Sequence, residues 1–207
     1  MHPPLLAAGC FLVSLVSAAK NPKRGLAYAE STITNDINLA AQSNSVISWL
    51  YNWGTSPPQY LQQSSIPYIP MQWGAGGVEN FAATVLASGA KTVLTFNEPD
   101  LGSQSNIEPA VAAKLYKQYI QPLSAQGIRL GAPAVTNGPM GRPWISSFLA
   151  NCTDCTIDFI PCHWYGDGVG NFYDYIWQMH GQFPQYPLWV TEFASTSSDD
   201  AGKLKMP

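Results

Sequence analysis

Two glutamates stand where apolar stretches of the sequence give way to polar residues. Glu98 follows residues 93–96 and Glu192 follows residues 188–190, and both stretches have the composition of buried strands. Pro99 lacks the N–H that would extend a strand ladder, and it biases Glu98 toward an extended backbone. The carboxyl ends of parallel strands commonly carry the reacting groups of a site. Two carboxylates facing one cleft predict glycosidic-bond hydrolysis, in which one donates a proton and the other attacks. The structural alternative is two unrelated acids that only form hydrogen bonds.

Aromatic and imidazole side chains are expected at the same strand ends. His163 and Tyr165 are two residues apart in an apolar segment, so they should share one face of a strand. Tyr165 could donate its hydroxyl to Glu192, and His163 could bond a sugar hydroxyl or simply be a buried core residue. Trp53 and Trp73 each precede a glycine at a strand end. They could stack on sugar rings or cap the core.

Seven segments of the chain have strand character and are separated widely enough for crossover connections. This spacing favours parallel pairing over hairpins. The segments are residues 24–30, 47–54, 66–74, 92–100, 128–135, 157–166 and 188–194.

Helical segments are expected between these strands. Pro122 should kink or end the second of the longer ones early. Alternation of strands and helices predicts an α/β fold of the (β/α)8 TIM-barrel type, with a doubly wound open sheet as the alternative. Because residues 195–207 contain no apolar run, about seven of the eight strands are expected, as in a barrel truncated at its C-terminal side. The longer helical segments are 80–88, 109–126 and 169–183, and the shorter ones are 35–42 and 56–65.

The composition indicates a single domain that binds an uncharged ligand. The 207 residues are 46% hydrophobic and only 11% charged, with 10 Lys and Arg against 13 Asp and Glu. The absence of a basic run disfavours a nucleic-acid partner. Aromatic residues make up 12% of the chain, including seven Trp, which favours a neutral ring-shaped ligand because flat apolar faces can stack on it.

The N-terminus resembles a secretion signal. Residues 5–16 are apolar but too short to span a bilayer, and small residues follow up to Ala18. We expect residues 1–18 to be a cleaved signal peptide and residues 19–207 to be the catalytic domain, without membrane association after cleavage. The alternative is an apolar N-terminal anchor. Asn151 opens an N-glycosylation sequon, which agrees with a secreted protein.

The cysteines also fit an oxidising compartment. If Cys10 leaves with the signal, Cys152 and Cys155 are close enough to form a disulfide, and Cys162 remains as a buried free thiol. A zinc site using these three cysteines and His163 is disfavoured, because adjacent strand residues such as 162 and 163 point to opposite faces.

Five motifs stand out over about residues 23–195: Asn97-Glu98-Pro99-Asp100, His163-Trp164-Tyr165-Gly166, Thr191-Glu192-Phe193, Leu50-Tyr51-Asn52-Trp53 and Pro70-Met71-Gln72-Trp73-Gly74. As an ordered set they resemble the fungal glycosyl hydrolase catalytic-core proteins of glycoside hydrolase family 128. Members of that family continue through an eighth strand and a closing helix, which this sequence lacks, so an unpaired strand edge is expected.

The resemblance implies a (β/α) barrel that hydrolyses β-1,3-glucan by a retaining, endo-acting mechanism. By position, Glu98 corresponds to the acid/base, Glu192 to the nucleophile and Asn97 to the residue that bonds the sugar 2-hydroxyl. We therefore expect a secreted or cell-wall protein, acting as a monomer with no metal or organic cofactor. Two alternatives remain: a glucan-binding protein without turnover, and a glycosidase for another neutral glycan such as a mannan or a β-1,4-glucan.

Overall fold

The computed structural model describes residues 19–29 and 33–198. The expected signal peptide, residues 1–18, lies outside the described residues. Each of the seven predicted strand segments contains all or most of one strand. Every strand except the last is shorter than its segment, and the last runs one residue further, to Ser195. The strands are β1 (Gly25–Ala27), β2 (Trp49–Tyr51), β3 (Met71–Gln72), β4 (Thr92–Asn97), β5 (Arg129–Ala134), β6 (Ile160–Gly166) and β7 (Leu188–Ser195).

All strand pairings in the described residues are parallel and join neighbours in chain order. The strands form three small sheets, β1-β2, β3-β4-β5 and β6-β7. Isolated parallel bridges connect these sheets, pairing Leu50 with Tyr68, Gly131 with Phe159, and Val135 with Cys162. A consecutive order of this kind differs from the reversed order of a doubly wound sheet. Within the described residues no pairing joins β7 to β1, so the strands form an open arc and not a closed barrel.

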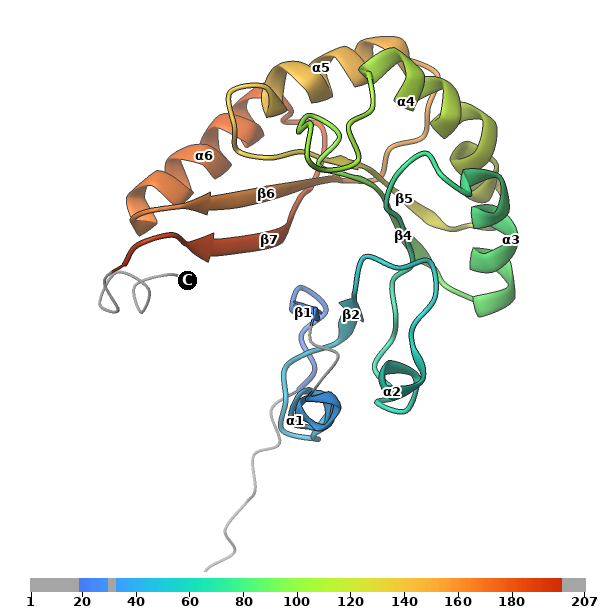
Figure 1. The fold of residues 1–207 in the computed structure, drawn as a ribbon, viewed down its shortest axis with the longest axis vertical. Helices are drawn as coiled ribbons and strands as arrows, with labels where there is room; N and C mark the ends of the chain where they lie inside the picture. The colour runs from blue at the N-terminus through green and yellow to red at the C-terminus, as the bar shows by residue number, and fades with distance from the viewer. Residues whose placement is uncertain (1–18, 30–32, 199–207) are drawn as a thin grey trace, which may run out of the picture.

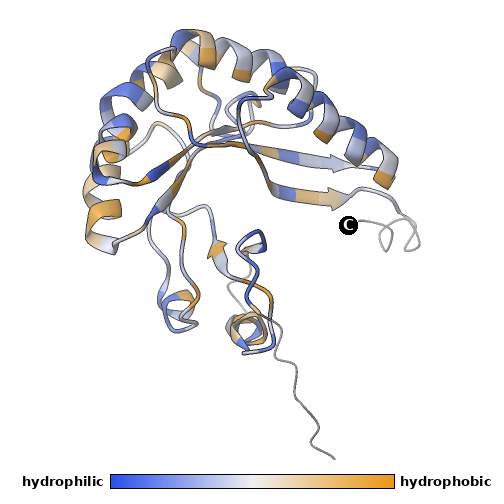
Figure 2. Cartoon of the chain, turned by 180° about the vertical axis from the view of Figure 1, so that it is seen from behind, coloured by the Kyte–Doolittle hydropathy of each residue, from blue (hydrophilic) through white to orange (hydrophobic). Residues whose placement is uncertain are grey.

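Four of the helices make an outer layer around the strands. Figure 1 shows α3 to α6 as an arc outside β4 to β7, while α1 and α2 lie with β1 and β2. The helices of the outer arc carry both hydrophilic and hydrophobic residues (Figure 2), as expected for helices with one face on a sheet. The helices are α1 (Ile37–Ala41), α2 (Gln59–Gln62), α3 (Val78–Ser88), α4 (Pro109–Leu115), α5 (Gly141–Asn151) and α6 (Val169–Gln182).

Two helical regions differ from the sequence expectation. The predicted helix 109–126 changes type: after α4 it continues as a π-helix over Tyr116–Ile120 and a 3-10 helix over Gln121–Gln126, which contains Pro122. The missing proline N–H thus coincides with the change in winding. Helix α5 was not predicted, because Gly141 and Pro143 open it. The buried residues Trp144, Ile145 and Phe148 have the spacing that would have revealed it.

The predicted disulfide is present. Cys152 and Cys155 form a bridge directly after α5, which rules out the zinc alternative because both thiols are used. Cys162 is a buried free thiol, as predicted, and burial raises its pKa to about 12. At neutral pH this thiol is therefore protonated and a poor nucleophile.

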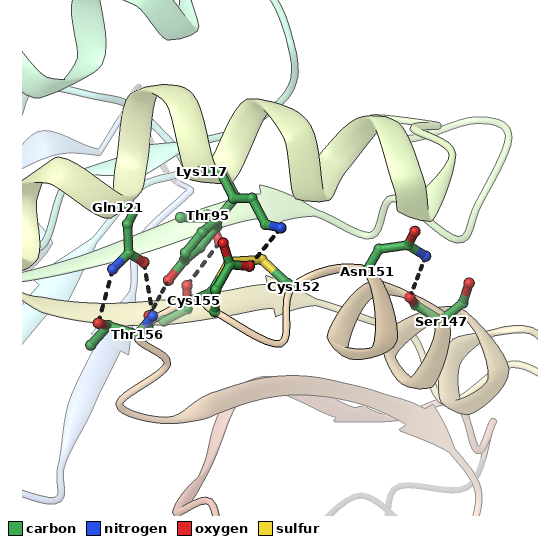
Figure 3. The surroundings of a disulfide bond; sticks show 11 residues. Thr95, Lys117, Gln121, Ser147, Asn151, Cys152, Cys155 and Thr156 are labelled. Carbon is green, nitrogen blue, oxygen red and sulfur yellow. Dashed lines mark hydrogen bonds and ion pairs between the residues drawn. A yellow bond between two sulfur atoms is a disulfide. The ribbon is translucent and has the colours of Figure 1, made fainter.

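The disulfide loop is attached to the helical segment that follows α4 (Figure 3). Lys117 Nζ lies 2.6 Å from Asp154 Oδ1. Gln121 both donates to the Thr156 hydroxyl, at 2.9 Å, and accepts the Thr156 backbone N–H, at 2.8 Å. Asn151, the expected glycosylation residue, is exposed at the end of α5, and its glycosylation stays a prediction.

Removing the bridge by combining Cys152→Ala with Cys155→Ala should lower the free energy of unfolding by about 2 kcal/mol, the loop-entropy estimate for so short a loop. Urea denaturation followed by tryptophan fluorescence measures this loss. Reduction of the parent protein should reproduce the shift, and identical midpoints for parent and variant would contradict the prediction.

The largest hydrophobic cluster lies between the outer helices and β4 to β6. It includes Phe81, Phe96, Tyr116, Ile145 and Phe148, each at most 1% exposed. Buried apolar area of this kind fixes the strands of the middle sheet and therefore the direction of the residues at their ends. In residues 19–29 and 33–198 no helix is both long and apolar enough to cross a membrane.

Candidate active site

The two predicted glutamates lie close together with His163 from β6: Glu98 directly follows β4, and Glu192 lies in the second half of β7. His163 Nδ1 lies 2.9 Å from Glu98 Oε1, and Nε2 lies 3.4 Å from Glu192 Oε1. One ligand atom from each of the three residues lies within 4.8 Å of the others. Residues that are 94 positions apart in the sequence, at 98 and 192, therefore face one another across a single imidazole.

The backbone of Glu98 is not extended, contrary to the expectation from Pro99. Its φ is 43°, in the left-handed region. Two hydrogen bonds hold this conformation: Glu98 N–H donates to Ala134 O at 2.7 Å, and Leu101 N–H donates to Glu98 O at 3.0 Å. Tertiary pairing to the end of β5 therefore outweighs the local preference. Strained backbone of this kind is concentrated at functional sites.

Glu192 is surrounded by hydrogen-bond donors from two other strands. Trp53 Nε1 donates to Glu192 Oε1 at 2.6 Å, and the Tyr165 hydroxyl donates to Oε2 at 2.9 Å. The Tyr51 hydroxyl donates to Thr191 O at 3.0 Å and lies 3.5 Å from Glu192 Oε1. Desolvation, followed by the nearby Glu192 carboxylate, raises the pKa values of Tyr51 and Tyr165 above their usual range, so both hydroxyls remain donors.

The two glutamates have different surroundings. Trp53 and Tyr165 both donate hydrogen bonds to Glu192. Glu98 is 7% exposed, and its side chain contacts His163. The two carboxyl groups therefore differ in the side chains that hold them.

His163 lies between the carboxylates and is 1% exposed. Although Nε2 is 3.4 Å from Glu192, it makes no well-aligned hydrogen bond within the described part of the chain. Glu98, His163 and Glu192 are also the group of described residues that could hold a metal ion. The imidazole turns a different nitrogen to each carboxylate, and within the described residues it is hydrogen-bonded to Glu98 through Nδ1.

Trp53 contacts Glu192, whereas Trp73 lies beside Asn97. Trp53 donates its indole N–H to Glu192, so its role is not limited to stacking on a sugar ring. Its φ of 63° lies in the left-handed region, as does that of Glu98. Trp73 is 40% exposed beside Asn97, whose backbone N–H donates to Trp73 O at 2.8 Å. Asn97 Nδ2 donates to Gln104 Oε1 at 3.3 Å, while Oδ1 has no partner in the described chain.

Two residues of this site were not predicted as site residues. Tyr51 was missed even though it is two residues before Trp53 in a predicted strand segment, where alternation would place both side chains on one face. Gln104 lies in the loop after Glu98, where no periodic sequence pattern indicates which way its side chain points. Its contact with Asn97 depends on how that loop folds back.

A cavity of about 630 Å³ opens beside this cluster. Trp53, Tyr165 and Glu192 line it, together with residues 23–27 at β1 and residues 190–193 of β7. Its size is within the range of small-molecule sites. A separate cavity of about 490 Å³ is lined by residues at the amino ends of the strands, including Thr92, and contains neither glutamate.

The sequence as a whole matches a protein family. The family model described as "Glycosyl hydrolase catalytic core" matches residues 25–206. The chain belongs to this glycosyl hydrolase family.

Relatives of this glycosyl hydrolase core include one curated protein and several solved structures. Alkali-sensitive linkage protein 1 of Schizosaccharomyces pombe (strain 972 / ATCC 24843) is 42% identical over 187 residues, covering 86% of this chain and 32% of that protein. The chain thus spans about a third of the length of that relative.

Two solved structures illustrate the similarity to glycoside hydrolase family 128. A curdlan-specific exo-β-1,3-glucanase of Blastomyces gilchristii, in complex with glucose, is 38% identical with a TM-score of 0.75, and the match covers 86% of this chain and 78% of that one. An endo-β-1,3-glucanase of Amycolatopsis mediterranei, in complex with laminaritriose, is 29% identical with a TM-score of 0.67, and covers 87% and 78%.

Proposed function

We propose that this glycosyl hydrolase core cleaves β-1,3-glucan with retention of anomeric configuration. The observation that carries the proposal is the convergence of Glu98 and Glu192, whose nearest ligand atoms lie within 4.8 Å. Retaining glycosidases hold their two carboxyl groups about 5 to 5.5 Å apart, whereas inverting enzymes need more room for a water molecule. The β-1,3-glucanase activities of the related structures support the choice of glycan.

In the proposed reaction Glu192 is the nucleophile and Glu98 is the acid/base. The Glu192 carboxylate attacks the anomeric carbon while Glu98 protonates the departing glycosidic oxygen, so the C–O bond breaks and a glycosyl ester forms on Glu192. Glu98 then removes a proton from water. The resulting hydroxide attacks the anomeric carbon, and the Glu192 carboxylate is released.

The surrounding residues support these roles. Trp53 and Tyr165 hold the Glu192 carboxylate in one orientation, because each bonds a different oxygen. In this proposal Asn97 bonds the 2-hydroxyl of the reacting sugar, and the unpartnered Asn97 Oδ1 in the described chain is an acceptor for it. His163 acts through Glu98 by holding its Oε1, which leaves Oε2 for the glycosidic oxygen.

Incubation of residues 19–207 with laminarihexaose tests the proposal. We expect reducing sugar to be released, and ¹H NMR of the first products should show the β-anomer before mutarotation. Products with the α-anomer would contradict retention. Binding to insoluble curdlan without product would instead support a glucan-binding protein, and activity only on mannan or a β-1,4-glucan would identify another neutral glycan as the substrate.

The cellular setting follows from the same proposal. A β-1,3-glucanase acts on cell-wall glucan, and we propose secretion through a signal at residues 1–18 and action as a monomer. The disulfide between Cys152 and Cys155 agrees with an oxidising compartment. We also propose a (β/α)8 barrel, of which residues 19–29 and 33–198 provide seven strands. Sequencing the N-terminus of the secreted protein tests the signal assignment.

Tyr165→Phe should lower kcat on laminarihexaose on the order of tenfold or more, because Glu192 loses a hydrogen bond made to a charged group. The substitution removes one oxygen atom from a partly exposed side chain, so folding should be unaffected. Steady-state kinetics measure the effect. Tyr173→Phe, at an exposed position of α6, is the matched control and should retain parental kcat. Equal kcat for both variants would contradict the positioning role of Tyr165.

A further inference from the structure

The backbone of Glu98 has a conformation that residues with a Cβ rarely adopt. Its φ is 43°, and its N–H donates to Ala134 O at 2.7 Å, in line with the parallel pairing of β4 and β5. Left-handed backbone at such a residue persists only where surrounding contacts hold it. The contacts made by the residues directly after Glu98 therefore help to determine where its carboxyl group points.

Asp100 continues the pairing of β4 and β5 beyond the strands with its side chain. Asp100 lies two residues after Glu98, as Thr136 lies two residues after Ala134. Asp100 Oδ1 accepts the Thr136 backbone N–H at 3.1 Å, and Oδ2 accepts the Thr136 hydroxyl at 2.5 Å. Both oxygens of one carboxylate thus bond one residue, and hydrogen bonds to a carboxylate are stronger than those to a neutral acceptor.

The residue that Asp100 bonds belongs to a firmly packed part of the molecule. The start of α5 lies directly against Thr136, because a Cβ added at Gly141 would collide with Thr136 O. Trp144 of α5 donates its indole N–H to Ile107 O at 2.8 Å, and Ile107 N–H donates to Pro99 O at 3.1 Å. The unit of β5 and α5 therefore holds the loop after β4 at two points, through Thr136 and through Trp144.

We propose that Asp100 is a positioning residue for Glu98, which rests on the proposed role of Glu98 as the acid/base. By bonding Thr136, the Asp100 carboxylate fixes the turn that directs the Glu98 carboxyl group at the glycosidic oxygen. Neither Asp100 nor Thr136 lines the cavity beside Glu192, so the role is one of orientation and not of substrate binding there. Orientation matters because a misplacement of about 1 Å can lower a rate on the order of 10²-fold.

Steady-state kinetics with laminarihexaose test the positioning role. Asp100→Ala should lower kcat by about ten- to hundredfold and leave KM within about twofold of the parent. Thr136→Val removes only the hydroxyl half of the contact and should lower kcat by about three- to tenfold, whereas Thr136→Ser keeps the hydroxyl and should restore it. Asp154→Ala, at an exposed carboxylate of the disulfide loop, is the control and should retain parental kcat.

A dinitrophenyl β-laminaribioside shows whether the loss arises at Glu98. Its leaving group departs without being protonated, so Asp100→Ala should form the glycosyl intermediate at the parental burst rate. Hydrolysis of that intermediate needs Glu98 as the base and should be slowed. An equal loss in the burst phase would indicate general damage to the site and overturn the positioning role.

The outcomes separate the positioning role from the proposed function. If the parent hydrolyses laminarihexaose while Asp100→Ala and Thr136→Val both keep the parental kcat, the positioning role is wrong and the function stands. If the parent acts on neither substrate, the proposed function fails and the positioning role fails with it. Should Asp100→Ala not fold, the Thr136 pair decides: a loss in Thr136→Val that Thr136→Ser restores supports the role, and equal kcat in both overturns it.

Discussion

Glu192→Gln is expected to reduce kcat/KM for laminarihexaose on the order of 10³-fold or more, equivalent to about 4 kcal/mol of transition-state stabilisation. The amide is a poor nucleophile, so the covalent glycosyl intermediate cannot form. Gln has nearly the shape of Glu, and its carbonyl oxygen can still accept from Trp53 or Tyr165. The loss should therefore reflect chemistry rather than unfolding, which circular dichroism can check.

Chemical rescue distinguishes the role of Glu192 from a general structural one. In Glu192→Gly, azide can enter the space left by the carboxylate and attack the anomeric carbon from that face. With a dinitrophenyl β-laminaribioside the expected product is the α-glycosyl azide, the configuration that results from a single displacement. Glu108→Gln, an exposed carboxylate outside the site, is the control and should keep parental activity. Formation of the β-glycosyl azide by the Glu192 variant would contradict its assignment as the nucleophile.

Glu98→Gln is expected to lower kcat/KM for laminarihexaose by about 10²- to 10⁴-fold, the usual contribution of a general acid and base. The effect should depend on the leaving group, because a dinitrophenolate departs without being protonated. For the dinitrophenyl substrate, formation of the glycosyl intermediate should proceed nearly as in the parent, while its hydrolysis is slow. A burst of dinitrophenolate in stopped-flow measurements is the expected observation.

Azide gives a second test of Glu98. In Glu98→Ala it should react with the glycosyl ester on Glu192 without needing a base, and release the β-glycosyl azide through two displacements. The two glutamate variants should therefore yield azides of opposite configuration. If Glu98→Ala lost the same factor on both substrates and showed no rescue, Glu98 would not be the acid/base.

Local sequence features predicted the strands and the two glutamates of the candidate site. Six of the seven strands lie within the predicted segments and β7 extends one residue further, to Ser195, because alternation and apolar runs are local signals. The placement of Glu98 and Glu192 at strand ends followed from the same runs. The disulfide between Cys152 and Cys155 was also predictable, since only two residues separate the cysteines.

Other features depended on packing between distant segments. Pro99 favoured an extended backbone at Glu98, yet the hydrogen bond from Glu98 N–H to Ala134 O holds Glu98 in the left-handed region. In that region strand alternation no longer gives the direction of the Glu98 side chain. The contact of Trp53 with Glu192 joins residues 139 positions apart. No short-range pattern could indicate which edge of the indole faces the carboxylate.

Local patterns in the chain placed Glu98 and Glu192 in or beside parallel strands, and so predicted the class of chemistry. The position of His163 between them and the hydrogen bonds of Trp53 and Tyr165 to Glu192 could be seen only in the folded molecule. Strand formation depends on neighbouring residues. The orientation of a side chain at a strand end depends instead on backbone torsion and on hydrogen bonds from other strands, which are set when the strands pack together.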